Sequence, residues 1–468
     1  MLFHTFKFVL FFSLFFSVYW SIRPHRWRML WLLVGSIYFY MSCVPWQIIL
    51  ILFTAGIDYL VALQMEKSWP QVWKRRLVTL SICINLGLLA FFKYSNFFLD
   101  NLDTVLHGVG LSVTGLRLNL ILPLGISFYT FETICYIVDV YQGKTKAVKS
   151  WLDYALYIMF FPHLIAGPIV RSHEFLPQLR RTKRFSWERM LVGTQLFIVG
   201  FFKKAILADQ LGILIVDPVF AQPDQFASHS IWLAVFGYAM QIYCDFSGYT
   251  DMARGLAQML GFHLPLNFNL PYLAKNVTEF WQRWHISLSS WLRDYLYIPL
   301  GGSRGPKWKT YRNLLITMVL GGFWHGAQWT FVVWGIYHGA LLAIHRMVRW
   351  PGWLSTRFGK VVSTTITFIL ISIGWVFFRA ESLSAAMHIL QRMMLPTSGI
   401  NLIPLMQLIG WVIVAGLLAG HVVVSLSDPA RWRYRWSPAL MGVGLASIFL
   451  LGLLFFPEGE RAFIYFQF

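Results

Sequence analysis

Apolar runs recur along the whole chain, and their lengths constrain its fold more than any other feature. A helix needs about 20 mostly apolar residues to cross a bilayer, and fewer where the helix is incomplete. With 57% hydrophobic and only 13% charged residues, the 468-residue chain is not a soluble, disordered or fibrous protein. We therefore predict a multi-pass, all-α integral membrane protein. Its candidate spans are residues 3–22, 29–44, 46–64, 77–92, 118–138, 190–217, 231–244, 313–323, 329–345, 361–378, 405–427 and 439–456.

One further apolar run, residues 152–167, is followed by Pro168 and contains Pro162 and Gly167, which would break a helix at membrane depth. If this run re-enters on the same side, the chain makes twelve crossings and both termini face the exterior. That arrangement places 31 of the 39 Lys and Arg residues in inside loops, as the positive-inside rule requires. The net charge of +19 follows from this bias, so nucleic-acid binding is not expected. These inside loops are 23–28, 65–76, 139–189, 245–312, 346–360 and 428–438.

We interpret the chain as one membrane domain in four parts, with about 11–13 transmembrane or re-entrant helices. N-terminal helices in 1–244 precede a cytoplasmic amphipathic or re-entrant segment at 245–312. A hairpin at 313–347 and C-terminal helices in 348–468 complete it. The first 22 residues lack a basic start and a cleavage site, so we expect a retained first span instead of a signal peptide.

The segment 245–312 carries far more ionisable groups than a connecting loop requires. Two amphipathic helices fit there, at about 249–261 and 276–292. The second begins at Asn276, with Glu279 three residues on, as in a capping box. Such a helix lies in the interface plane or dips into the bilayer from the cytoplasmic side.

Histidines supply the candidate chemistry. His325 follows the apolar run 313–323, whose eleven residues rise only about 16 Å, roughly half of a hydrocarbon core of about 30 Å. An ionisable group near the bilayer midplane is a functional-site candidate, although hydrogen bonding between helices is the alternative. His285 is either an interfacial residue or a site residue. His338 lies thirteen residues after His325 and could face it across the hairpin, but packing is the favoured interpretation.

Metal chemistry and a serine triad both lack sequence support. No H-x-x-x-H pattern or paired carboxylate lies near His325, the four cysteines do not have zinc spacing, and no G-x-S-x-G elbow is present. We therefore expect no bound metal and no tightly bound cofactor. A buried histidine with Trp, Arg and Gly neighbours favours acyl transfer from an already activated donor, for which a base and fixed dipoles suffice.

Several motifs make the chain similar to a known family. They are Asn267-Phe-Asn-Leu-Pro-Tyr272, Glu279-Phe-Trp-Gln-Arg-Trp-His-Ile-Ser-Leu-Ser-Ser-Trp-Leu-Arg-Asp-Tyr-Leu-Tyr297, Leu300-Gly-Gly-Ser-Arg304 and Gly321-Gly-Phe-Trp-His-Gly-Ala327. Together they resemble the membrane-bound O-acyltransferase family, in its bacterial polysaccharide branch. The similarity extends to the final Phe463-Ile-Tyr-Phe-Gln-Phe468.

This resemblance implies a many-helix fold around a central tunnel, with His325 as the catalytic histidine. His285 occupies the position of the second site residue, where eukaryotic members commonly have Asn, so an Asn–His mechanism does not transfer unchanged. The resemblance also implies the bacterial inner membrane, acetyl-CoA as donor, and a periplasmic lipase-like partner acting with a polysaccharide synthase or export complex. Alginate, cellulose or another exopolysaccharide would be the final acceptor.

Donor binding is expected around the basic segment, where Lys275, Arg283, Arg293, Arg304 and Lys307 could meet CoA phosphates or, equally, lipid headgroups. The candidate donor-binding residues are Trp281, Arg283, Trp284, Arg293, Asp294, Trp324 and His338. For chemistry, neutral His325 acts as a general base or forms a covalent acetyl-imidazole, and His285 orients it or holds the thioester carbonyl.

Three alternatives stay open. The chain could be a D-alanyl or other acyltransferase of the same family, fed by a carrier protein. It could be a transporter, because transporters also combine broken helices with midplane ionisable groups. It could also be a subunit of a polysaccharide synthase with no chemistry of its own.

Overall fold

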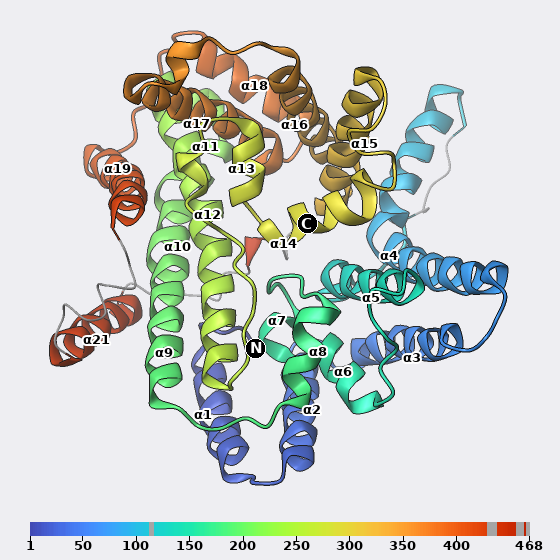
Figure 1. Ribbon diagram of the computed structural model, residues 1–468. Helices are drawn as coiled ribbons and strands as arrows, with labels where there is room; N and C mark the ends of the chain where they lie inside the picture. The colour runs from blue at the N-terminus through green and yellow to red at the C-terminus, as the bar shows by residue number, and fades with distance from the viewer. Residues whose placement is uncertain (112–116, 428–437, 455–462, 465–468) are drawn as a thin grey trace. The chain divides into compact units, whose positions relative to one another are not determined.

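The computed structural model describes residues 1–111, 117–427, 438–454 and 463–464 (Figure 1). Within these ranges the chain is helical and forms no sheet, and one isolated bridge pairs Phe226 with Ile400. Five helical segments are long and apolar enough to cross a membrane, and two shorter apolar helices accompany them. The predicted all-α, multi-pass membrane class is therefore confirmed. The five segments are Pro45–Met65, Gln71–Gly108, Trp187–Ala221, Arg357–Arg379 and Pro404–Leu426.

The described residues form two compact units. The first comprises Met1–Thr194 with Ala253–Pro265, and the second comprises Gln195–Met252 with Leu266–Phe468. His285, His325 and His338 all belong to the second unit. The four-part division of the sequence, the number of crossings and the central tunnel stay predictions.

The first unit contains the N-terminal helices. Its elements are α1 (Phe6–Ser21), α2 (His25–Met41), α3 (Ile48–Met65), α4 (Gln71–Gly108), α5 (Ile126–Tyr141), α6 (Trp151–Met159), α7 (Phe161–Leu164) and α8 (Ser172–Arg180). The apolar run 152–167 is broken near Pro162, as the sequence predicts, because α6 ends at Met159. The freed N–H of Phe161 donates to Ser36 Oγ at 3.2 Å, which satisfies a backbone donor that would otherwise be buried alone.

Buried polar groups on α3, α4 and α5 pair with one another inside the first unit. The Asp58 carboxylate accepts hydrogen bonds from Ser81 at 2.5 Å and from Asn85 at 3.0 Å. On α5, the Glu132 carboxylate lies 3.2 Å from His163 Nδ1, and both side chains are almost fully buried. These contacts join helices whose other faces are apolar.

The second unit begins within α9 (Trp187–Phe201), which continues through the π-helical turns Phe202–Ala208 and Gly212–Val216 to α11 (Asp217–Ala221). Its remaining helices are α12 (Ser228–Met259), α13 (Val277–Arg283), α14 (Ile286–Leu292), α15 (Lys307–His325), α16 (Trp329–Met347), α17 (Arg357–Arg379), α18 (Leu383–Met394), α19 (Pro404–Leu426) and α21 (Pro438–Leu454). The basic loop 428–437 lies outside the described residues.

The prediction of a span ending at residue 244 and a separate helix at 249–261 is wrong. A single helix, α12, runs without interruption through these positions (Figure 1). The polar residues that suggested a boundary are neutralised by π-helical lysines, because Lys204 Nζ lies 2.5 Å from Asp245 and Lys203 Nζ lies 2.7 Å from Asp251. Paired charges are tolerated in a buried helix where single ones would be expelled.

The prediction of one amphipathic helix over 276–292 is also wrong. Asn276 does cap the first turn, since its side chain accepts from the N–H of Glu279 at 2.8 Å, and Glu279 accepts in return from the N–H of Lys275. The helix nevertheless stops at Arg283 and restarts at Ile286. Between these helices His285 has φ 42°, in the left-handed region, which ends helical propagation.

Helices α15 and α16 form a tight hairpin. A Cβ atom on Gly335 would lie 2.8 Å from the Cα of Val319, and one on Gly339 would lie 3.0 Å from the Cα of Leu315. Because real Cβ atoms do not approach backbone this closely, glycine at these positions lets the two helix backbones touch. The predicted hairpin over 313–347 is therefore present, with its first helix starting earlier, at Lys307.

Candidate active site

His325 ends α15 and is almost fully buried, with 5% of its surface exposed. Its imidazole contacts the rings of Trp324, Trp334 and Phe378, with centroid separations of 5.0, 5.2 and 5.2 Å. The next residue, Gly326, is extended, and a Cβ there would overlap the ring of Phe331. The chain therefore leaves the helix directly after His325 and presents the imidazole in an aromatic enclosure.

His285 is fully buried at the junction of α13 and α14. Its left-handed backbone is an uncommon conformation for a residue with a side chain, and neighbouring hydrogen bonds hold it there. Asn267 supplies two of them, since its carbonyl accepts from the N–H of Ile286 at 2.9 Å and its Oδ1 accepts from the N–H of Ser287 at 3.1 Å. The Asn267 motif thus fixes the turn that positions His285.

Burial lowers the pKa of His285 to about 3. The imidazole is consequently neutral at physiological pH, with one nitrogen able to donate a hydrogen bond and the other able to accept one.

The two histidines converge on one indole. The ring of Trp324 lies 6.4 Å from the ring of His285 and 5.0 Å from that of His325. On its other side, His285 contacts Phe246 of α12, with centroids 4.6 Å apart. The sequence prediction joined these histidines by resemblance alone, and the structure brings both to Trp324 from positions forty residues apart.

His338 of α16 is fully buried and belongs to the same aromatic cluster. Its ring contacts Trp334 at 4.7 Å and Trp281 at 5.2 Å. Neither ring nitrogen has a hydrogen-bond partner among the residues that the structure describes. Trp334 therefore contacts both His325 and His338, and the two histidines of the hairpin are linked through this indole.

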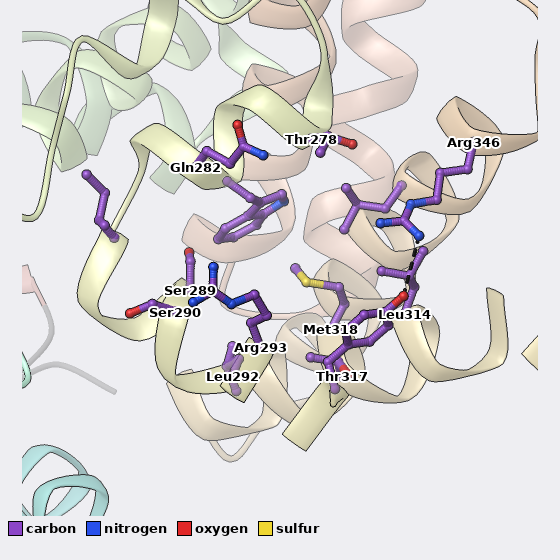
Figure 2. Close-up of a pocket in the computed structure, with 14 residues that line it drawn as sticks. Thr278, Gln282, Ser289, Ser290, Leu292, Arg293, Leu314, Thr317, Met318 and Arg346 are labelled. Atoms are coloured by element: carbon purple, nitrogen blue, oxygen red, sulfur yellow. Dashed lines mark hydrogen bonds between the residues drawn. The ribbon is translucent and has the colours of Figure 1, made fainter. Parts of the chain in front are cut away.

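A pocket of about 320 Å³ opens beside this cluster (Figure 2). Trp281 belongs to both, because it lines the pocket and contacts the rings of His338 and Trp334. The walls combine apolar side chains with hydroxyls, one amide and two arginines. They are formed by Thr278, Trp281, Gln282, Ile286, Ser289, Ser290, Leu292, Arg293, Tyr297, Leu314, Thr317, Met318, Leu342 and Arg346.

The two arginines of the pocket are both exposed enough to meet a ligand. Arg346, labelled in Figure 2, donates to the Tyr297 hydroxyl at 3.4 Å. It also donates to Ser303 Oγ at 3.1 Å. Arg293 pairs with the Asp294 carboxylate at 2.7 Å. A hydroxyl-paired guanidinium keeps its full charge, so Arg346 favours an anionic group at this wall.

Other predicted donor-binding residues lie away from the pocket. Arg283 donates to Glu279 at 2.8 Å and to the Asn269 carbonyl at 3.1 Å, so it braces α13. Trp284 is buried against Phe268 and Trp375, each 4.9 Å away between ring centroids. Of the five cations expected to meet phosphates, Arg293 lines the pocket, whereas Lys275, Arg283, Arg304 and Lys307 are not among its lining residues.

Sequence reasoning missed several lining residues, including Thr278, Gln282, Ser289, Ser290 and Arg346. Thr278, Trp281 and Gln282 have the i, i+3, i+4 spacing of one helical face, a signal that could have grouped them. Arg346 lies outside the segment 245–312, and only the hairpin geometry brings it to the pocket.

The described part of the C-terminal motif reaches the same region. Phe463 contacts Phe246, with ring centroids 5.5 Å apart, and the N–H of Ile464 donates to Asp245 Oδ2 at 3.0 Å. The remaining residues of that motif, 465–468, lie outside the described ranges.

Among the residues that the structure describes, no three His, Cys, Asp or Glu side chains are grouped as metal ligands. The arrangement offers instead neutral imidazoles, indoles and a partly cationic pocket. Such groups suit proton transfer and binding of an anionic, activated donor.

The helical membrane fold holds buried histidines in an aromatic cluster beside a pocket, and comparison with known proteins gives the class of protein to which this arrangement belongs. The family model described as "MBOAT, membrane-bound O-acyltransferase family" matches residues 146–377. Taken with the relatives below, this shows that the chain belongs to the membrane-bound O-acyltransferase family and is an acyltransferase.

The names of three relatives refer to alginate, peptidoglycan and teichoic acid. The chain is 41% identical over 390 residues to a probable alginate O-acetylase AlgI of Azotobacter vinelandii, covering 82% of this chain and 76% of the relative. It is 38% identical over 395 residues to a peptidoglycan O-acetyltransferase of Helicobacter pylori, covering 78% and 73%. It is 30% identical over 277 residues to a teichoic acid D-alanyltransferase of Bacillus subtilis, covering 56% and 70%.

Proposed function

We propose that the protein is a membrane O-acetyltransferase that moves an acetyl group from cytoplasmic acetyl-CoA toward an extracytoplasmic polysaccharide. The observation that carries this proposal is the chain of contacts from the pocket to the catalytic candidate: Trp281 lines the pocket and contacts Trp334, and Trp334 contacts His325. The similarity to an alginate O-acetylase and a peptidoglycan O-acetyltransferase supports acetyl as the transferred group.

The pocket supports a thioester donor. Its volume of about 320 Å³ is at the lower end of ligand-site volumes, which suits an acetylated pantetheine arm but not the whole of CoA. The nucleotide and its phosphates would stay outside, near Arg293 and Arg346. A charge-assisted hydrogen bond from either guanidinium to phosphate would orient the donor.

The chemistry needs no bound cofactor. Neutral His325 takes the proton from an acceptor hydroxyl while that oxygen attacks the thioester carbon. The carbon–sulfur bond then breaks, and the departing thiolate receives the proton from His325. His285, held neutral, orients His325 or donates a hydrogen bond to the carbonyl oxygen as negative charge develops there. In the covalent variant, a His325 nitrogen attacks the thioester carbon, the carbon–sulfur bond breaks, and the thiolate leaves with the proton lost from the imidazole. The acceptor hydroxyl then attacks the acetyl-imidazole, forms the ester and returns its proton to the released imidazole.

The acceptor is proposed from the relatives' polymers. Alginate is the first candidate, and cellulose or another exopolysaccharide is the alternative. A periplasmic lipase-like partner would place the acetyl group on the polymer in concert with the synthase or export complex, and the protein would lie in the bacterial inner membrane. These polymers carry many hydroxyl groups, which are the acceptors that an acetyl ester requires.

The test compares secreted polysaccharide from cells with wild-type protein and with His325→Ala. Loss of about 42 Da per modified hydroxyl, the mass by which acetyl exceeds hydrogen, is expected by mass spectrometry. Persistent acetylation with His325→Ala protein in the membrane contradicts the catalytic assignment. A His285→Ala variant that is expressed normally and turns over normally reduces His285 to a packing residue.

The D-alanyltransferase alternative is favoured by one observation, the 30% identity to a teichoic acid D-alanyltransferase. Purified protein in detergent, offered acetyl-CoA or an aminoacylated carrier protein, separates the two. Release of free CoA thiol from acetyl-CoA supports the proposal. Thiol release only from the carrier protein favours the alternative.

A further inference from the structure

A cluster of cations in the first unit shares no residue with the site described above. We define the cation cluster as Arg28, Arg181, Lys183, Arg184 and Arg189. Arg28 of α2 ties it together, because its guanidinium donates to the Lys183 carbonyl at 2.7 Å and to the Ile22 carbonyl at 2.6 Å. These bonds fix the α1–α2 turn to the segment that leads from α8 into α9.

Carboxylates do not neutralise this cluster. None of its five cations forms an ion pair with an acid among the described residues, and Glu188, the acidic residue of this segment, is exposed. Burial, together with the charges of Arg189 and Arg181, lowers the pKa of Lys183 to about 8. Neighbouring positive charges make a protonated Lys183 less favourable, and an anion bound beside it would relieve this repulsion.

The Lys183 ammonium is held in place without an anion. It lies 4.2 Å from the centroid of the Phe262 ring, and its side chain is buried. The guanidinium of Arg189 donates to the Arg184 carbonyl, which fixes a second cation beside it. The positive charges are therefore preorganised on a backbone that the fold already orders.

Aromatic rings surround the cluster at the ends of membrane helices. Helix α1 ends at Ser21, α2 begins at His25, and the span Trp187–Ala221 begins here. Trp187 and Trp27 are 79% and 63% exposed, and Phe185 stacks edge-on between Trp20 and Trp187, at 5.4 and 5.0 Å. Exposed Trp beside Arg at helix ends is typical of the level where lipid headgroups lie.

We propose that the cation cluster binds the headgroup of an anionic phospholipid of the cytoplasmic leaflet. Phosphate oxygens would be met by Arg181, Lys183 and Arg184, while Trp27 and Trp187 lie along the upper acyl chains. A lipid is favoured over an acidic protein because the cluster lies beside the end of α1 and the beginnings of α2 and α9, and because its exposed neighbours are aromatic rings. Lipid binding there would stabilise the α1–α2 turn, independently of the catalytic proposal.

Native mass spectrometry of the full-length protein, titrated with phosphatidylglycerol or phosphatidylcholine in neutral detergent, tests this. The wild-type protein should retain more phosphatidylglycerol than phosphatidylcholine. R181Q/R184Q should weaken retention by about fivefold for each lost charge, about 25-fold in total. R181K/R184K should retain it, and R117Q should leave it unchanged, because Arg117 is already paired with Asp100 at 2.7 Å.

Three results overturn the proposal. The first is that the wild-type protein retains phosphatidylcholine as well as phosphatidylglycerol, and the second is that R181Q/R184Q retains phosphatidylglycerol as well as the wild type does. The third is that millimolar glycerol 3-phosphate displaces the lipid, which would mean that the site binds a soluble phosphate. Thermal unfolding of each variant without lipid shows whether the Gln substitutions have simply unfolded the protein. If R181Q/R184Q is unfolded, the same titration with the single variant R181Q decides, with loss of about fivefold supporting the proposal and no change overturning it.

Discussion

The imidazole of His325 packs edge-on against the indole of Trp334, with ring centroids 5.2 Å apart and planes at 84°. The same indole contacts His338 and Trp281. One side chain therefore links the proposed base to the wall of the proposed donor pocket, and its shape fixes the position of both.

Replacing Trp334 by Phe should lower kcat about tenfold while leaving the KM for acetyl-CoA nearly unchanged. The smaller ring frees space in which the His325 imidazole can turn, and a misplacement of about 1 Å can cost up to about 100-fold in rate. Steady-state thiol release measures both constants. Trp350→Phe, at an exposed position, is the control. An unaltered kcat in Trp334→Phe would show that His325 is positioned without this indole.

Replacing Arg346 by Gln should raise the KM for acetyl-CoA about tenfold with little change in kcat, because the lost hydrogen bond would be to a charged phosphate. Acetyl-pantetheine, which lacks the nucleotide phosphates, should be used equally well by both proteins. Arg283→Gln is the matched control, since Arg283 is paired with Glu279 and does not line the pocket. Equal KM effects of the two substitutions would contradict a phosphate-binding role for Arg346.

Acidification should destabilise the wild-type protein through His285. Its folded pKa of about 3 lies below the unfolded value of about 6.5, so the unfolded chain binds more protons between these limits. Stability is therefore full above pH 6.5 and falls as pH decreases, by about 2 kcal/mol at pH 5. His285→Asn should show a correspondingly smaller drop in apparent Tm between pH 7 and pH 5. Parallel drops in both proteins would mean that His285 does not titrate on unfolding.

Replacing Lys204 by Met should be far more damaging than replacing Lys203. Lys204 Nζ lies 2.8 Å from Asp209 and 2.5 Å from Asp245, so its loss leaves two buried carboxylates facing each other. Breaking a buried pair in this way costs about 3–5 kcal/mol. Folded yield by size-exclusion chromatography should collapse for Lys204→Met, and the double variant with Asp245→Asn should recover part of it. If the folded yield of the double variant does not recover, the loss comes from disturbed packing and not from unpaired charge.

Removing the Asn267 side chain should reduce activity more than stability. Asn267→Ala deletes the acceptor for the Ser287 N–H, which costs about 1 kcal/mol of stability, and it loosens the left-handed turn at His285. Thiol release should fall by about tenfold, in line with loss of orientation at a site residue. Asn269→Ala is the comparison, because the Arg283 contact there uses the Asn269 backbone carbonyl, which the substitution retains. Equal activities for the two variants would mean that the turn is held by other bonds.

The membrane class and the burial of His325 could be predicted because they leave strong local signals. Long apolar runs anticipated most helices, and Pro162 anticipated the break after Met159. His325 was found from its depth along a short run, and it does end a helix within an aromatic enclosure. Such features depend on residues that are neighbours in sequence.

Contacts between residues far apart in the sequence could not be predicted. Asp245 and Asp251 look like the end of a span, and they become ordinary helix residues only because Lys204 and Lys203 approach from another helix. The helix break at His285 depends likewise on Asn267, eighteen residues earlier. Arg346 reached the pocket only through the folding of the hairpin. No pattern of hydrophobicity records these partners.

The glycine contacts between α15 and α16 have a mechanical consequence. With Gly335 seated against Val319 and Gly339 against Leu315, neither helix can slide or roll past the other without a steric clash. The hairpin therefore behaves as a rigid bar that carries His325 and His338 at a constant spacing. An opening that admits the proposed acceptor to His325 would therefore have to come from the elements around this bar.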